Sequence, residues 1–169
     1  AADAYHSGWD TAWELRSEHY LLKSQTTYDY NATILAFAEA VYRDLAEVFS
    51  AEPDRQALPL RVNVLWDPEV YDEQRAREAD GDESYRANPL NAFLATYSKA
   101  VFVRSFGGDG ADWTPYHLTH GLSLQFIDAV VPNLRCAALR ESIVAYFTFF
   151  AFLPRHRIRA EFPMPPGTP

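Results

Sequence analysis

A run of apolar residues with helical spacing sets the strongest limit on how this chain folds. It is flanked by two segments in which apolar and polar side chains alternate. Between residues 31 and 49, apolar side chains recur every three or four positions, which predicts a helix with one apolar face and Asn31 or Asp29 as its N-cap. Residues 13–25 predict a strand pair or one long strand, and residues 58–66 predict a half-buried strand. The helical stripe contains Ile34, Phe37, Ala38, Val41, Leu45 and Val48, and the strand alternates Leu60, Val62, Val64 and Trp66 with polar residues. An apolar helix face and apolar strand faces must bury each other, so we expect a helix packed on a sheet.

The second half of the chain predicts a further strand pair and two helices. Residues 67–89 suggest a short helix and then an exposed loop, and residues 91–106 two short strands with a turn near Ser98 and Lys99. Residues 107–112 read as a flexible loop, and residues 114–130 as a helix that Pro132 ends. Residues 137–152 form a second helix, so apolar that we expect most of its circumference to be buried. The fold class is therefore a small mixed α+β domain over residues 1–152, with residues 153–169 as a proline-rich tail or linker.

Charge and composition exclude several classes of protein. The formal net charge of −8 and the lack of a basic face argue against nucleic acid as a partner. Cys136 is the only cysteine, so an internal disulfide framework is impossible. No uninterrupted apolar run reaches the roughly 20 residues of a membrane helix, and we expect no membrane span. The small residues at the start resemble the end left by signal-peptide cleavage, which favours a secreted or periplasmic protein.

Two histidines and a glutamate have the spacing of a metal site. His117 and His120 are three residues apart on one predicted helix, so both side chains can reach one ion. Glu141 on the following helix can supply a third ligand, which gives a His/His/Glu zinc site with one open position. Two alternatives remain open. The histidines can be a structural pair, and Glu141 can accept a hydrogen bond from an aromatic hydroxyl (Tyr116 or Tyr97) or pair with Arg104.

At these residues the chain resembles the gluzincin clan of zinc metallopeptidases, in particular the bacterial peptidase-MA-like domains. That family carries motifs like "HELTHGL" and "WLxEGLAEYF", and this chain has "YHLTHGL" at residues 116–122 and "ALRESIVAYF" at residues 138–147. The likeness continues upstream through "HYLLKS", "LPLRVNVLW" and "FLATYSKAVFV", so it covers about residues 13–152. It implies a zincin-like fold in which a motif helix precedes a glutamate-bearing helix, a zinc cofactor, and a peptide or protein as the substrate or ligand.

The departures from the family pattern concern the catalytic residues. Aligned without a gap, Tyr116 replaces the first ligand, His117 replaces the general-base glutamate, and His120 and Glu141 are kept. If one residue is deleted instead, His117, His120 and Glu141 are the three ligands. We prefer the deletion because it keeps the flanking residues of the motif.

In both alignments the general-base carboxylate is missing, and only Tyr116 or His117 stands where a substitute base is needed. The sequence therefore predicts a metallopeptidase-like domain in which peptide hydrolysis is weak or lost. The alternative is a metal-free pseudoenzyme that binds an extended peptide or protein segment between the strand at residues 93–97 and the motif helix.

Overall fold

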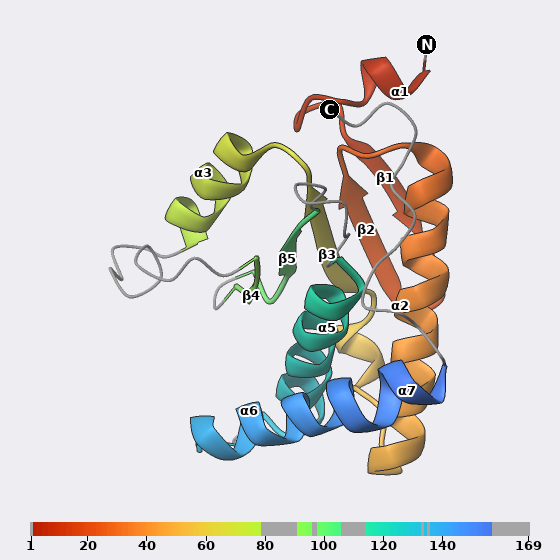
Figure 1. Ribbon diagram of the computed structural model, residues 1–169, viewed down its shortest axis with the longest axis vertical. Coiled ribbons are helices and arrows are strands. Elements are labelled where there is room, and N and C mark those ends of the chain that lie inside the picture. Colours follow the sequence, from red (N-terminus) through yellow and green to blue (C-terminus); the bar gives the residue numbers. More distant parts are fainter. Residues whose placement is uncertain are drawn as a thin grey trace.

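The computed structural model describes residues 2–78, 91–95, 98–105, 114–132, 134 and 136–156. The fold is mixed α+β, as predicted, and is built on a five-stranded sheet with the order β1-β2-β3-β5-β4 (Figure 1). The central strands β2, β3 and β5 are parallel, and the two edge strands β1 and β4 run antiparallel to their neighbours. The strands are β1 (Trp13–Arg16), β2 (Tyr20–Ser24), β3 (Leu60–Leu65), β4 (Ala92–Leu94) and β5 (Val101–Arg104).

Helices cover both faces of the sheet because its strands are apolar on both sides. On β5, Val101 and Val103 face a core cluster shared with α2 and α5, whereas Phe102 faces a second cluster that includes Tyr71 of α3. This alternation is the two-residue period of a strand. The helices and helical turns are α1 (Ala2–Tyr5), α2 (Tyr28–Phe49), η1 (Arg55–Ala57), α3 (Pro68–Glu78), α5 (Thr114–Val130), α6 (Ala137–Tyr146), the π-helical segment η2 (Phe147–Phe152) and α7 (Leu153–Arg155).

The first predicted helix is confirmed, but its start is earlier than expected. Thr27, rather than Asn31 or Asp29, is the N-cap of α2, and its side chain accepts a hydrogen bond from the backbone N–H of Tyr30. Asn31 is instead buried inside the first turn, where it accepts a hydrogen bond from the hydroxyl of Thr26. The apolar stripe is buried as predicted except for Val48, which is exposed because it lies in the last turn beside the C-cap.

The strand predictions are confirmed in type, with one error of burial. Residues 13–25 form the predicted strand pair, and residues 91–106 contain β4 and β5, which pair antiparallel. Lys99, one of the two residues of the predicted turn, has a positive φ of 54°. Trp66 was expected in the buried face of the third strand, but β3 ends at Leu65 and the Trp66 side chain is exposed. The loops expected at residues 79–89 and 107–112 lie outside the described residues.

The C-terminal helix differs most from the prediction. Its α, π and α segments follow one another without a break to Arg155, so the helix continues beyond residue 152. Most of its circumference was expected to be buried, yet several large apolar side chains are exposed, because only one side of it meets α5 and α2. These side chains are Leu139, Tyr146, Phe149 and Phe150. By length and composition alone, this 19-residue helix is one that can cross a membrane, and 28% of its most apolar 18-residue window is buried in the structure.

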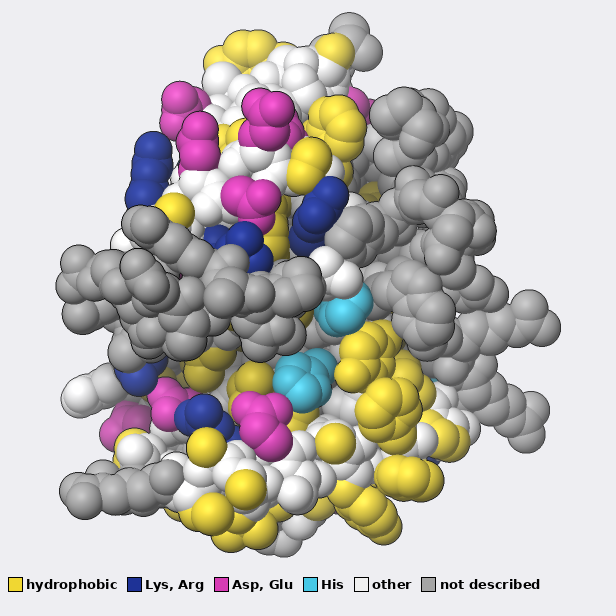
Figure 2. Space-filling model, turned by 60° about the vertical axis from the view of Figure 1, so that its left-hand side comes forward, with side chains coloured by type: hydrophobic (Ala, Val, Ile, Leu, Met, Phe, Trp, Pro, Cys, Tyr) yellow, Lys and Arg dark blue, Asp and Glu magenta, His cyan; other side chains and the backbone are white. Residues whose placement is uncertain are grey.

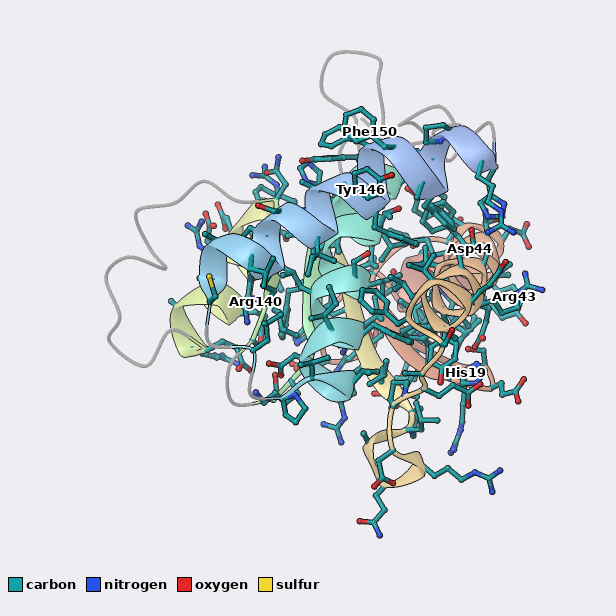
Figure 3. All side chains as sticks on the ribbon, turned by 90° about the horizontal axis from the view of Figure 1, so that it is seen from below. His19, Arg43, Asp44, Arg140, Tyr146 and Phe150 are labelled. Atoms are coloured by element: carbon teal, nitrogen blue, oxygen red, sulfur yellow. The ribbon has the colours of Figure 1, made fainter. Side chains whose placement is uncertain are left out.

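Two histidine–carboxylate pairs attach other elements to α2. His19, in the turn between β1 and β2, approaches Glu39 with 2.7 Å between its Nδ1 atom and the carboxylate, and its backbone N–H donates to the same group. Burial alone would raise the pKa of Glu39, but hydrogen bonds from Ser17 and His19 outweigh burial and lower it. Five residues further along α2, Asp44 lies 2.7 Å from His156 and also pairs with Arg155. These contacts fix the end of the C-terminal helix (Figure 3).

Candidate functional site

The candidate site lies where α5 meets α6. Leu124 and Ile127 of α5 form a buried cluster with Val144 of α6, and this contact sets the two helices against each other. One side of the junction carries His120 and Glu141, whose Nε2 and Oε2 atoms are 3.4 Å apart. The structure thus brings together two of the residues that the sequence predicted as metal ligands.

Burial controls the charge of His120. Burial lowers the pKa of His120, and the nearby Glu141 carboxylate opposes this only in part. The imidazole is therefore held neutral over more of the physiological pH range than an exposed histidine. The Glu141 side chain is 49% exposed, so its carboxylate is largely solvated. A neutral imidazole beside a solvated carboxylate can bind a cation or accept a proton.

Tyr116 and His117 lie on the turn before His120 but have different neighbours. Tyr116 precedes His120 by one helical turn, and their ring centroids are 6.3 Å apart. The His117 ring is 4.9 Å from that of Tyr116, and its Nε2 atom lies 3.3 Å from the side-chain nitrogen of Asn91. Asn91 immediately precedes β4, so His117 faces the sheet edge whereas His120 faces α6.

Of the three predicted ligands, the structure places His120 and Glu141 next to each other, whereas His117 lies beside Asn91. Within the described parts of the chain, no three His, Cys, Asp or Glu side chains are grouped closely enough to hold a metal ion. Of the other partners considered for Glu141, Tyr97 lies outside the described residues, and the ion pair observed for Glu141 is with His120. Figure 2 shows two histidine side chains on this face of the molecule, one of them next to an acidic side chain.

Sequence reasoning missed two residues near the site. Asn91 contacts His117 although it lies far away in the sequence, and only the pairing of β4 with β5 brings it there. The ring of Phe149 is tilted against that of Tyr116, with 5.1 Å between their centroids, because the π-helical segment follows α6 past the start of α5. The first residue gave no sequence signal. The second belonged to an aromatic run that was interpreted as core.

The edge strand β4 lies beside the motif helix. β4 pairs with β5 through three residue pairs, and among the described strands β5 is its only partner. Leu94 of β4 packs against the same cluster that joins α5 to α6. The main-chain groups on the outer side of β4 are therefore close to the helix that carries His117 and His120.

The close approach of the Gly121 backbone to the Val101 side chain sets the distance between α5 and the sheet. A Cβ atom added to Gly121 would lie 2.6 Å from Cγ1 of Val101 in β5. Only glycine fits there without a shift, so Gly121 positions the adjacent His120 relative to the sheet.

Comparison with protein families, with curated proteins and with solved structures finds no match for this chain.

Proposed function

We propose that this chain is a gluzincin-like domain of the zincin fold that binds an extended peptide or protein segment and hydrolyses peptides weakly or not at all. The observation that supports this most is the His120–Glu141 pair between α5 and α6. In the resemblance to the gluzincins, these two positions carry zinc ligands on successive helices. A chance pair of histidine and glutamate has no reason to occur at both motif positions.

The ring geometry favours the alignment without a gap over the deletion that we preferred from the sequence. Tyr116 and His120 are one helical turn apart, as the two histidines of an H-E-x-x-H helix are, and their rings are tilted against each other with 6.3 Å between the centroids. His117 then takes the position of the general-base glutamate, and it faces the start of β4. Loss of general acid–base assistance typically costs about 10²- to 10⁴-fold in rate, which is the basis for expecting weak or no hydrolysis.

A peptide held beside β4 and the motif helix is the binding mode that we propose for the metal-free alternative. An extended peptide that pairs with an edge strand gains main-chain hydrogen bonds without needing a particular sequence. Because β4 lies beside α5, such a peptide passes the motif helix near His117 and Tyr116.

Zinc binding is the second candidate, and one distance favours it. Two ligands of a tetrahedral zinc ion at about 2.0–2.1 Å are roughly 3.3 Å apart, and His120 and Glu141 are separated by 3.4 Å. His120 and Glu141 would hold the ion, with His117 or Tyr116 as a further donor after a side-chain rotation. A bound zinc ion would supply Lewis acidity and lower the pKa of a bound water. The neutral form of His120 is the form that a metal requires.

Two measurements test these proposals. In the first, fluorescence anisotropy measures the binding of a labelled, extended Thr/Lys decapeptide to the protein, and we expect binding. A decapeptide that does not bind would contradict the proposed peptide-binding function. In the second, the protein is melted with and without zinc.

A stabilisation of about 2.7 kcal/mol at a hundred times the dissociation constant, abolished by His120→Ala, would establish the metal site. Casein cleavage at a rate usual for metallopeptidases, sensitive to a chelator, would contradict the proposed loss of hydrolysis.

A further inference from the structure

The C-terminal helix presents three exposed aromatic side chains on its outer side. Tyr146, Phe149 and Phe150, here called the aromatic shelf, are 67%, 50% and 74% exposed. Tyr146 and Phe150 stack with ring centroids 5.8 Å apart, and Figure 3 shows both on the outer side of the helix. Apolar side chains that lie together in water cost free energy, so a shelf of this kind marks a contact surface.

The π-helical geometry of η2 explains why two neighbouring rings of the shelf are both exposed. Residues 147–148 are buried, residues 149–150 are exposed, and residues 152–153 are buried again. The buried pairs therefore repeat after five residues, which is the spacing of the hydrogen bonds in a π-helix and is longer than one turn of an α-helix. The wider turn keeps both buried pairs in the core and leaves residues 149–150 side by side on the outside.

The part of the helix that carries the shelf has no charged side chain. Residues 142–154 are all uncharged, with Glu141 before them and Arg155 after them. The helix Ala137–Arg155 as a whole has the length and the hydropathy of a segment that crosses a membrane. A partner that binds through opposite charge finds no group to pair with on the shelf, whereas an apolar phase can cover it completely.

The inner side of the helix keeps it on the protein. Val144, Phe147 and Phe152 are at most 3% exposed and belong to the core clusters shared with α2 and α5. Arg155 pairs with Glu47 of α2, and the next residue pairs with a second carboxylate of the same helix. A helix that crossed a membrane would lose all of these contacts, whereas a helix that lies in the plane of the interface buries one face only. Only the outer face is therefore available to lipid.

Area and shape separate a lipid surface from the other kinds of partner. Three rings exposed to this extent present on the order of 400 Å², which is below the roughly 800 Å² per partner of a stable interface between two copies. The outer side of a helix is convex, whereas sites for small molecules are concave. Figure 1 shows this helix crossing one end of the molecule, and a fluid lipid surface adapts to such a ridge.

Charge decides which kind of lipid fits. The protein carries a net charge of −8, and the segments α6 and η2 contain Arg140 as their only basic residue. Helices that bind anionic membranes are rich in Lys and Arg on their polar face. An acidic protein without such a face is repelled by anionic headgroups. Zwitterionic headgroups carry no net charge, so they leave the burial of the rings as the driving force.

We propose that the aromatic shelf binds the surface of a zwitterionic phospholipid membrane, with the helix Ala137–Arg155 lying in the interface and not crossing it. The three rings of the shelf enter the boundary between headgroups and acyl chains, as the aromatic residues of interfacial helices do. Phe149 of the shelf lies 5.1 Å from Tyr116 of α5, so a bound membrane lies close to the candidate functional site. The proposal goes beyond peptide and zinc binding and depends on neither.

Sedimentation with phosphatidylcholine vesicles tests the proposal, because it measures the bound fraction of the protein. We expect the parent to bind and Tyr146→Ser/Phe150→Ser to lose at least about tenfold in its partition coefficient. Tyr5→Ser/Val48→Ser changes side chains that are 68% and 57% exposed elsewhere and is the matched control, which keeps binding. Urea midpoints equal to that of the parent show that both variants are folded. Phe150→Ser alone repeats the test at the most exposed ring of the shelf.

Vesicles that contain phosphatidylserine test the role of charge. At low salt we expect the parent to bind them more weakly than pure phosphatidylcholine, because the negative charges of protein and lipid repel each other. Binding that becomes stronger with phosphatidylserine would mean that basic residues, and not the rings, hold the protein on the membrane. That result would overturn the proposal.

Two further results would overturn it. The first is a parent that does not sediment with phosphatidylcholine, or one that sediments no more than Tyr146→Ser/Phe150→Ser. The second is a parent that is dimeric in sedimentation equilibrium when the variant is monomeric, since the shelf would then be an interface between two copies. Peptide and zinc binding are measured without vesicles, so each of these results leaves the proposed function intact.

Discussion

Replacing Gly121 with alanine is expected to destabilise the protein, although alanine is the better helix former. The new Cβ atom would lie 2.6 Å from Cγ1 of Val101, and a carbon–carbon contact needs about 3.5 Å. Helix α5 and strand β5 would have to separate by roughly 1 Å, because Val101 is fully buried and its branched side chain is stiff. Overpacking of this kind costs about 1–3 kcal/mol, whereas the helix gains about 1 kcal/mol from the change. The expected net loss is about 0–2 kcal/mol.

A second substitution isolates the clash. Val101→Ala removes the methyl group that the new Cβ would meet, so in that background Gly121→Ala should stabilise the protein by about 1 kcal/mol. The same substitution therefore has opposite expected signs in the two backgrounds. The coupling energy of this double-mutant cycle is the overpacking cost itself, about 1–3 kcal/mol.

Urea unfolding followed by circular dichroism measures all four proteins. The slope of the free energy against urea concentration must stay constant for the comparison to hold. A stabilisation of Gly121→Ala by about 1 kcal/mol in the parent, equal to that in the Val101→Ala background, would refute the close approach of α5 to β5. A separation of α5 from the sheet would also displace His120. We therefore expect Gly121→Ala to bind zinc more weakly than the parent.

Three further predictions concern ionisable residues. Burial lowers the pKa of His120, so the unfolded chain binds more protons than the folded chain at this residue. The free energy of unfolding should therefore fall as pH drops below about 6.5. His120→Gln should reduce this loss, which is measured from urea midpoints between pH 5 and 8. The pKa of Glu39 is lowered, so its stabilising contribution is present above about pH 4.3 and is lost as pH falls through the folded pKa. Glu39→Gln should therefore cost about 1 kcal/mol at pH 7 and little at pH 3, measured in the same way. Asp44→Asn should weaken the contacts with Arg155 and His156 and lower stability by about 1 kcal/mol in thermal melts.

Local patterns predicted the element types well because each depends on neighbours in the sequence. The α5 helix begins and ends at the predicted residues, and the alternation in β3 matches its burial from Leu60 to Val64. The start of α2 was wrong because several residues there can act as an N-cap, and only the path of the chain from β2 selects Thr27. Burial of Trp66 and Val48 was wrong for a similar reason, since both lie at the end of an element where the periodic pattern no longer decides.

Helix spacing predicted one contact of the candidate site, that of His120 with Glu141, but not the neighbours of His117. The meeting of His120 with Glu141 follows from two motifs on successive helices, and the structure contains it. The neighbours of His117 do not follow from the spacing of His117 and His120, because Asn91 reaches His117 only through the position of β4. The exposure of Phe150 could not be predicted from apolar composition, because composition does not say whether another element covers a helix.

Among the described residues, three histidine–carboxylate pairs join elements of the fold, and their differences bear on which one has a function. His19–Glu39 and His156–Asp44 are both 2.7 Å apart, and each carboxylate has a further donor nearby, which is the geometry of a structural contact.

The His120–Glu141 pair is longer, at 3.4 Å, and its carboxylate is half solvated, so it contributes least to stability of the three. A pair that stabilises the fold so little, in a position where burial opposes protonation of the histidine, is poorly explained as a structural contact. It follows that His120→Ala should leave the fold intact, and that a loss of zinc-induced stabilisation in this variant would report on the site and not on unfolding.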